Sequence, residues 1–210
     1  MMDIERILRQ PAKDQQWILK TVIGGVLLFI PVVSFVAYGY LLETAKKGMQ
    51  NSDELPPWEN WLDMFVKGFM VSVISVVYLL VPLTVMVLGW GLGSASMIHG
   101  GYQTWDTVGF GAASLVGLVL ALVFGFFVPM AWIHYAACDR FRAALEFGVL
   151  WERIRAVFKE YFLAYLTYTI LLVVVSMAFS LIPAIGIIIA SIVNFYVSLA
   201  FMYEFGRIYG

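Results

Sequence analysis

Long apolar runs without a charged side chain constrain this chain more than any other feature. Four ranges contain no Asp, Glu, Lys or Arg: 68–88, 108–137, 161–182 and 184–203. A helix needs roughly 20 apolar residues to cross the hydrocarbon core of a bilayer. Because no water is present there to satisfy backbone N–H and C=O groups, a lone run of this kind must form a helix. We therefore predict four membrane-spanning helices over these ranges.

The composition supports a membrane protein throughout. Of the 210 residues, 62% are hydrophobic and only 13% are charged, whereas a soluble domain carries about 25% charged residues. The formal net charge of -1 argues against a nucleic-acid partner, which requires a basic face. We expect an all-α polytopic transmembrane helix bundle of five or six membrane segments, with residues 1–210 forming a single integral membrane domain.

The first apolar stretch, 17–42, admits two arrangements because Pro31 interrupts it. It can cross the membrane once as a kinked helix, or it can enter and return as a hairpin with two short arms. A repeated pattern favours the hairpin. Phe29-Ile30-Pro31-Val32-Val33-Ser34 resembles Leu181-Ile182-Pro183-Ala184-Ile185-Gly186, which has to turn between two full spans. The sequence leaves both arrangements open.

The distribution of positive charge predicts the orientation. Lys and Arg residues occur in 1–20, 43–67 and 139–160 and at Arg207, but the expected loop at 89–107 and the turn at Pro183 contain none. Cytoplasmic loops of membrane proteins are enriched in Lys and Arg. We predict that residues 1–16 form a cytoplasmic N-terminal segment, that the C-terminus is also cytoplasmic, and that the protein spans the cytoplasmic membrane.

The charged range 139–160 has the pattern of an amphipathic helix lying at the membrane interface. Apolar residues recur near helical spacing, and charged residues stand between them. The arginines could contact anionic lipid headgroups or a protein partner, although the helix could equally cap the bundle. The candidate contact residues are Arg140, Arg142, Arg153 and Arg155.

Small residues at four-residue spacing predict helix packing. One ridge consists of Gly109, Ala113, Gly117, Ala121 and Gly125, and the last span carries Gly186, Ala190, Asn194 and Ser198 at the same spacing. Such ridges allow helices to approach closely in a membrane, so we expect both to be buried against neighbouring helices. Asn194, the most polar group at mid-depth, is the candidate interhelical polar contact, since an unpaired amide in hydrocarbon is costly.

No pattern in the sequence indicates catalysis. The single cysteine, Cys138, excludes a cysteine-based zinc site, and the histidines, His99 and His134, fall on opposite sides of the membrane in this topology. Glu204 is the one candidate for a proton relay, but it lies at the end of a span beside Arg207. We predict no catalytic residue, no metal and no cofactor.

Several motifs carry a resemblance to a known family. They are Asp3-Ile4-Glu5-Arg6, Leu55-Pro56-Pro57-Trp58-Glu59-Asn60-Trp61 and Phe141-Arg142-Ala143-Ala144-Leu145-Glu146-Phe147-Gly148. With these, nearly the whole chain resembles the domain of unknown function 4013 family of bacteria and archaea. Ser34 departs from the family's pattern, where Asn is expected. The resemblance implies a prokaryotic cytoplasmic membrane protein and implies nothing about activity.

The expected function follows from what the apolar helices lack. Without an ionisable group at mid-depth or a soluble domain, we expect a non-enzymatic accessory or scaffold subunit of a membrane assembly. The alternative is a transporter or channel for a small or lipid-like substrate. The expected partners are membrane lipids and other membrane protein subunits.

Overall fold

The computed structural model describes residues 3–98, 104–182 and 185–210, and the side chains of 3–91, 111–182 and 185–210. In those ranges the chain is helical and has no strand. The elements are α1 (Ile4–Arg9), η1 (Pro11–Lys13), α2 (Trp17–Phe29), α3 (Ser34–Met49), α4 (Trp61–Ile98), α5 (Thr104–Gly125), α6 (Val128–Cys138), η2 (Phe141–Leu145), α7 (Phe147–Ala156), α8 (Phe158–Ser180) and α9 (Ile185–Tyr209). The all-α prediction is confirmed for these residues. His99 and the turn at Pro183 lie outside them.

Among the described residues, four apolar segments are long enough to cross a membrane. They are Trp61–Gly91, Gly111–Cys138, Phe158–Ser180 and Ile185–Tyr209, and each contains most of one predicted span. The segments begin earlier or end later than the apolar runs because charged residues at their ends continue the helix, such as Lys159 in α8 and Glu204 in α9. The protein is an integral membrane protein with a helical membrane bundle.

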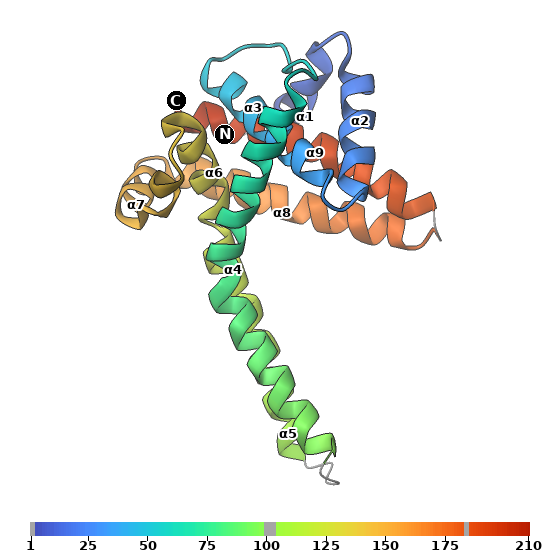
Figure 1. Cartoon of the computed structure of the whole chain (residues 1–210), viewed down its shortest axis with the longest axis vertical. Helices are drawn as coiled ribbons and strands as arrows, with labels where there is room; N and C mark the ends of the chain where they lie inside the picture. The colour runs from blue at the N-terminus through green and yellow to red at the C-terminus, as the bar shows by residue number, and fades with distance from the viewer. Residues whose placement is uncertain (1–2, 99–103, 183–184) are drawn as a thin grey trace. The chain divides into compact units, whose positions relative to one another are not determined.

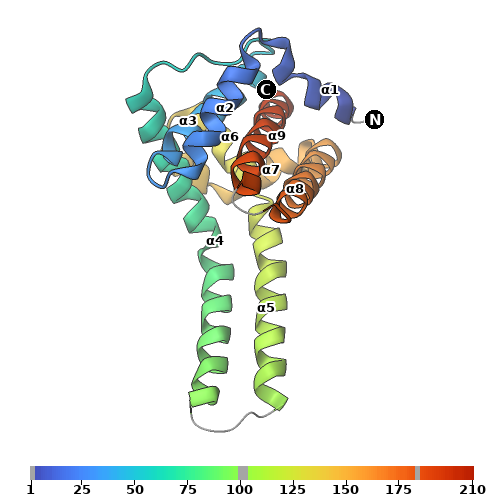
Figure 2. The ribbon, with the colours of Figure 1, turned by 90° about the vertical axis from the view of Figure 1, so that its right-hand side faces the viewer.

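The predicted loop at 89–107 is wrong, because helix occupies most of it. α4 is 38 residues long and ends at Ile98, and α5 begins at Thr104. Each glycine in a helix costs about 1 kcal/mol relative to alanine, but here the neighbouring helix compensates. A Cβ placed on Gly89 would lie 2.1 Å from Cβ of Ala113, so the missing side chain lets α4 and α5 run side by side (Figure 2).

The predicted span at 108–137 is also interrupted. α5 ends at Gly125, and α6 begins at Val128 after a turn at Phe126 and Phe127. Pro129 fits this break, because proline has no N–H to bond the carbonyl four residues back and is most favourable in the first turn of a helix.

The chain forms two compact units, Met1–Ser72 with Pro129–Gly210, and Val73–Val128. Within the first unit, α9 is the central helix and contacts α1, η1, α2, α3 and α8 (Figure 1). Its side chains Phe195, Phe201 and Phe205 are completely buried. Burial of these aromatic rings makes the C-terminal helix the core of the unit.

The stretch 17–42 contains two helices rather than one kinked helix. The chain turns between Ile30 and Val33, with Val32 at a φ of 70°. At 13 and 16 residues, α2 and α3 measure about 20 and 24 Å at 1.5 Å per residue, less than a hydrocarbon core of about 30 Å. Entry of this hairpin into the bilayer stays a prediction.

Glycines let the backbones of α3, α4 and α9 approach one another within the first unit. A Cβ on Gly39 would lie 1.9 Å from the carbonyl oxygen of Met64, and one on Gly48 would lie 2.0 Å from the carbonyl oxygen of Tyr203. Real side-chain carbons cannot come that close to a backbone oxygen. α3 is therefore held between the start of α4 and the end of α9 by contacts that only glycine permits.

The range 139–160 is not one amphipathic helix. It consists of the 3-10 segment η2, the ten-residue helix α7 and the first turn of α8, separated at Glu146 and Val157. Along the apolar stripe of α7, Leu150 and Ile154 are fully buried in the protein, whereas Phe147 and Trp151 remain 47% and 43% exposed. The position of α7 at the membrane interface stays a prediction.

Candidate functional site

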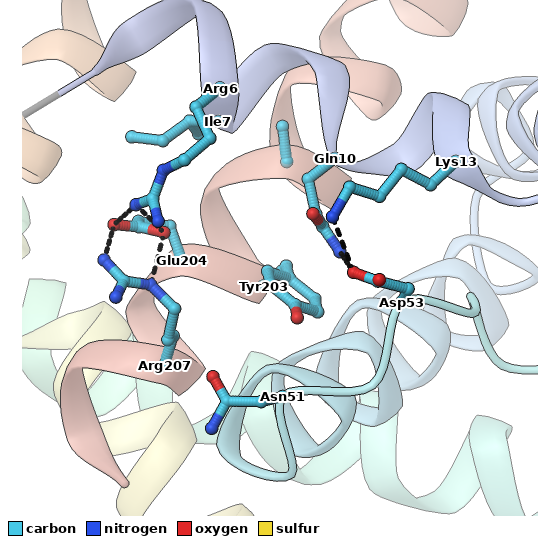
Figure 3. Close-up of a pocket in the computed structure, with 10 residues that line it drawn as sticks. Arg6, Ile7, Gln10, Lys13, Asn51, Asp53, Tyr203, Glu204 and Arg207 are labelled. Atoms are coloured by element: carbon cyan, nitrogen blue, oxygen red, sulfur yellow. Dashed lines mark hydrogen bonds and ion pairs between the residues drawn. The ribbon is translucent and has the colours of Figure 1, made fainter.

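Charged side chains gather where α9 ends. Glu204 is only 4% exposed and accepts hydrogen bonds from two arginines (Figure 3). Arg207, one turn later in α9, donates from Nε to Oε2 at 2.9 Å and from Nη2 to Oε1 at 2.5 Å. Arg6 of α1 donates from Nη2 to Oε1 at 3.2 Å. We call Arg6, Glu204 and Arg207 the arginine–glutamate cluster.

The cluster joins the two ends of the chain. A buried carboxylate requires charged partners that compensate for its lost hydration, and two guanidinium groups provide them here. Tyr196 strengthens the same attachment, because its hydroxyl donates to the carbonyl oxygen of Leu8 at 2.5 Å. The segment carrying Arg6 thus lies on the same side of the protein as the C-terminal end of α9.

A polar cavity of about 190 Å³ lies beside the cluster. Figure 3 shows it between the cluster and a second group, in which Gln10 and Lys13 both donate to Asp53. Lys13 Nζ is 2.7 Å from Asp53 Oδ1. These hydrogen bonds, first from Lys13 and then from Gln10, lower the pKa of the Asp53 carboxyl. Tyr203 lines the cavity between the two groups.

A second buried ion pair fixes the loop that follows α3. Lys20 Nζ donates to Asp14 Oδ2 at 2.7 Å and to the carbonyl oxygen of Leu55 at 3.0 Å. Burial opposes charge on Asp14, but the hydrogen bonds from Lys20 and from the backbone N–H groups of Gln16 and Leu55 outweigh it and lower the pKa of the carboxyl. The pair ties α2 to the loop at Leu55.

Asn194 makes a bond between two helices. Its Nδ2 donates to Ser176 Oγ of α8 at 3.0 Å, while its Oδ1 is buried and has no partner among the described residues. One turn further along α9, the hydroxyls of Ser198 and Tyr168 lie 3.1 Å apart. At the start of the predicted ridge, a Cβ on Gly186 would lie 2.1 Å from the carbonyl oxygen of Phe179. This face of α9 packs on α8.

The other predicted ridge meets α4 at Ala113 and Gly117. A Cβ on Gly117 would lie 2.2 Å from Cγ of Met86, and Ala113 lies against Gly89. Leu118, the next residue along α5, is 54% exposed. Gly109 falls where side chains are not described.

The four candidate arginines belong to two short elements. Arg140 and Arg142 stand at η2, and Arg153 and Arg155 stand near the end of α7. All four are exposed, and within the described part of the chain none forms an ion pair. Arg153 Cζ lies 4.4 Å from the centre of the Tyr209 ring, and Arg155 Cζ lies 6.0 Å from that of Trp151.

His134 is a structural residue of the first unit. It is 5% exposed, and its Nδ1 lies 2.6 Å from the hydroxyl of Tyr209. Among the described residues, no group of three or more His, Cys, Asp or Glu side chains is arranged to hold a metal ion.

Sequence reasoning paired Glu204 with Arg207 but missed Arg6 and the pair of Asp14 with Lys20. Arg6 and Glu204 are 198 positions apart, so no spacing rule connects them. A usable signal was the density of charge in the N-terminal segment, because charged residues near a membrane tend to pair with one another.

The comparisons with known proteins identify a family. A profile described as "Protein of unknown function (DUF4013)" matches residues 22–184, so Arg6, Glu204 and Arg207 lie outside the matched range. No curated protein and no solved structure shows significant similarity to the chain. Because the match covers most of the chain, the protein belongs to the DUF4013 family, as its sequence motifs suggested.

Proposed function

We propose that this protein is a non-enzymatic accessory or scaffold subunit of a larger membrane assembly. It would reside in the cytoplasmic membrane of a bacterium or archaeon with both termini in the cytoplasm. The proposal rests on how the apolar helices use their polar side chains.

Several of those side chains bond neighbouring helices to each other. Asn194 donates to Ser176, and Ser191 Oγ donates to the carbonyl oxygen of Gly25 at 2.7 Å. In the second unit, Trp90 Nε1 donates to Ser114 Oγ at 3.2 Å. A transport pathway needs polar groups that face water or a substrate, whereas bonds between helices make a rigid frame. This use of polar groups supports a structural role.

An open position on the second unit supports contact with further helices. A Cβ placed on Gly111 of α5 would meet no described atom within 4 Å. Lipid chains gain nothing from a small residue, but a second helix does, because its backbone can approach. Gly111 therefore marks a surface where another membrane subunit can pack.

Purification in a mild detergent tests the proposal. The tagged chain is isolated from its native membrane, and its mass is measured with bound proteins retained. We expect one partner protein at a fixed ratio. The variant Gly111→Leu should lose it while keeping its melting temperature. Gly148→Leu, at another glycine whose Cβ would meet no described atom within 4 Å, should retain it.

The transporter alternative predicts a different result. The purified chain alone, in liposomes, would then carry a small or lipid-like substrate across the bilayer. Asn194 does not line the cavity between the arginine–glutamate cluster and Asp53, and replacing it by Leu tests its part in transport. Flux by the isolated chain that Asn194→Leu abolishes would overturn the scaffold proposal.

A further inference from the structure

A second cavity, of about 180 Å³, opens on the other side of the arginine–glutamate cluster. α1, α8 and α9 all contribute to it. Its lining comprises Arg6, Lys159, Glu160, Leu163, Glu204, Arg207 and Ile208. All three helices belong to the first unit.

The charge of this cavity favours an anion. Three cations, Arg6, Lys159 and Arg207, face two carboxylates, Glu160 and Glu204, which leaves one positive charge in excess. Glu204 is shared by both arginines and can neutralise only one of them. An anion in the cavity would supply the missing negative charge.

Hydrogen-bond donors are also left over. In the part of the chain that the structure describes, Arg6 uses only Nη2 of its guanidinium, and Lys159 Nζ has no hydrogen-bond or ion-pair partner. Arg207 directs Nε and Nη2 at Glu204, leaving Nη1. Guanidinium groups match phosphate oxygens in geometry, and a lysine adds a mobile point charge. Together they form a set of donors suited to a phosphate group.

The position of the cavity indicates that the phosphate belongs to a lipid and not to a free ion. α8 begins and α9 ends here, and both are candidate spans that run antiparallel, since Asn194 meets Ser176 while Ser198 meets Tyr168. The ends of spanning helices lie at the headgroup level of a membrane. Leu163, which is 37% exposed, and Ile208 give the cavity an apolar wall. A free phosphate ion cannot use that wall, whereas the glycerol and acyl portion of a lipid can.

We propose that this cavity binds the phosphodiester of an anionic phospholipid. Arg6, Lys159 and Arg207 contact the phosphate oxygens, and Leu163 and Ile208 contact the start of the acyl chains. The bound lipid seals the junction of α1, α8 and α9. This site is distinct from the exposed arginines of η2 and α7.

Binding of a short-chain lipid to the full-length chain in a neutral detergent tests the site. Native mass spectrometry measures the bound fraction of dioctanoyl phosphatidylglycerol as its concentration rises. Replacing Lys159 by Gln should weaken binding about fivefold, the equivalent of about 1 kcal/mol per cation at a lipid surface. Lys159 is exposed and forms no ion pair in the described chain, so the variant should fold normally.

The control variant Arg9→Gln removes the same charge from an exposed residue that, among the described residues, pairs only with Glu5 and does not line the cavity. We expect its lipid affinity to stay within about twofold of the original. Equal weakening in both variants would mean diffuse attraction and would refute the site. Displacement of the lipid by inorganic phosphate at equal concentration would also overturn the proposal, because the occupant would then be a free anion.

Discussion

Glu204 lies where water hardly reaches, and its contacts with Arg6 and Arg207 connect the two ends of the chain. Its side chain is 6% exposed, compared with 52% for Arg6 and 34% for Arg207. The arginines can turn to water if the carboxylate is lost, but the attachment of α1 to α9 cannot survive unchanged. The cost of removing Glu204 should therefore appear first as loosening of α1 and only second as global unfolding.

Glu204→Gln tests this connection. The amide cannot attract two guanidinium groups, so the backbone N–H groups of α1, residues 4–9, should exchange with deuterium faster in mass-spectrometric measurements. Exchange in the middle of α9 should not change. The control is Glu5→Gln, which breaks only the exposed pair with Arg9. Unaltered exchange in α1 of the Glu204 variant would contradict the role assigned to the cluster.

Asp14→Asn tests the second buried pair. Removing the carboxylate leaves Lys20 buried opposite a neutral group, a change that costs about 3 kcal/mol in the free energy of unfolding. The thermal unfolding of the purified protein measures it. Asp53→Asn, which breaks the exposed pair with Lys13, should have little effect. An equal loss of stability in Asp53→Asn would show that burial does not make the pair of Asp14 and Lys20 more stabilising than an exposed pair.

Asp14 also predicts how the stability of the protein depends on pH. Its pKa lies below the ordinary value of 3.8 in the folded protein, so the unfolded chain binds a proton more readily than the folded one. The stabilisation by Asp14 is complete above pH 3.8 and is lost as pH falls through the lower folded-state value. The stability difference between wild type and Asp14→Asn should therefore shrink under acidic conditions, as followed by melting temperature between pH 6 and 3.

At the scale of the helices, close packing depends on the positions of the glycines, which have no side chain. α4 and α5 contact each other at Gly89 and Gly117, and α3 contacts its neighbours at Gly39 and Gly48. Lipid does not force apolar helices together, so close approach at small residues has to do so. The outward positions of α5, such as Leu118, are large and exposed.

Gly117→Leu should separate α4 from α5. The new side chain would occupy the space that Met86 fills, and overpacking of this kind costs about 1–3 kcal/mol. Gly111→Leu, on the same helix where a Cβ would meet no described atom within 4 Å, should cause no loss, because leucine also favours helix over glycine. Melting temperatures of the two purified variants give the comparison. Equal stability would place the Gly117 face against lipid.

The helices show which parts of the fold can be predicted from the sequence and which cannot. Uncharged runs located the four spans, Pro31 located the turn of the hairpin, and four-residue spacing located the contact of Gly117 with α4. Each is a local pattern within one stretch of the chain. The helical extent of 89–98 was missed because glycine counts against a helix until a neighbouring helix compensates for it.

The candidate site was harder to predict because it arises from tertiary packing. The contact of Arg6 with Glu204 exists only because α1 folds back along α9. The four arginines selected from the sequence are exposed at η2 and α7, and none of them lines either cavity at the arginine–glutamate cluster. Composition identifies charged residues near a membrane, but it does not say which of them face the same cavity.

At the scale of the whole molecule, the number of crossings decides on which side each end lies. Four candidate spans and a hairpin that returns to its own side give an even number, which agrees with the contact of Arg6 and Glu204. The positive-inside rule predicts that this side is the cytoplasm. The turn after α8, where Leu181 is 83% exposed, would then face outward.

Cysteine labelling in intact cells tests this topology. In a Cys138→Ser background, Leu181→Cys should react with a membrane-impermeant maleimide, because its side chain projects from the turn. Glu54→Cys, in the loop after α3, should react only after the membrane is opened, since Lys13 and Gln10 bond Asp53 and hold that loop beside the N-terminal segment. Reporter proteins fused at each end should both be active in the cytoplasm. An external N-terminus with an internal C-terminus would mean that 17–42 crosses the membrane once, and the hairpin would be wrong.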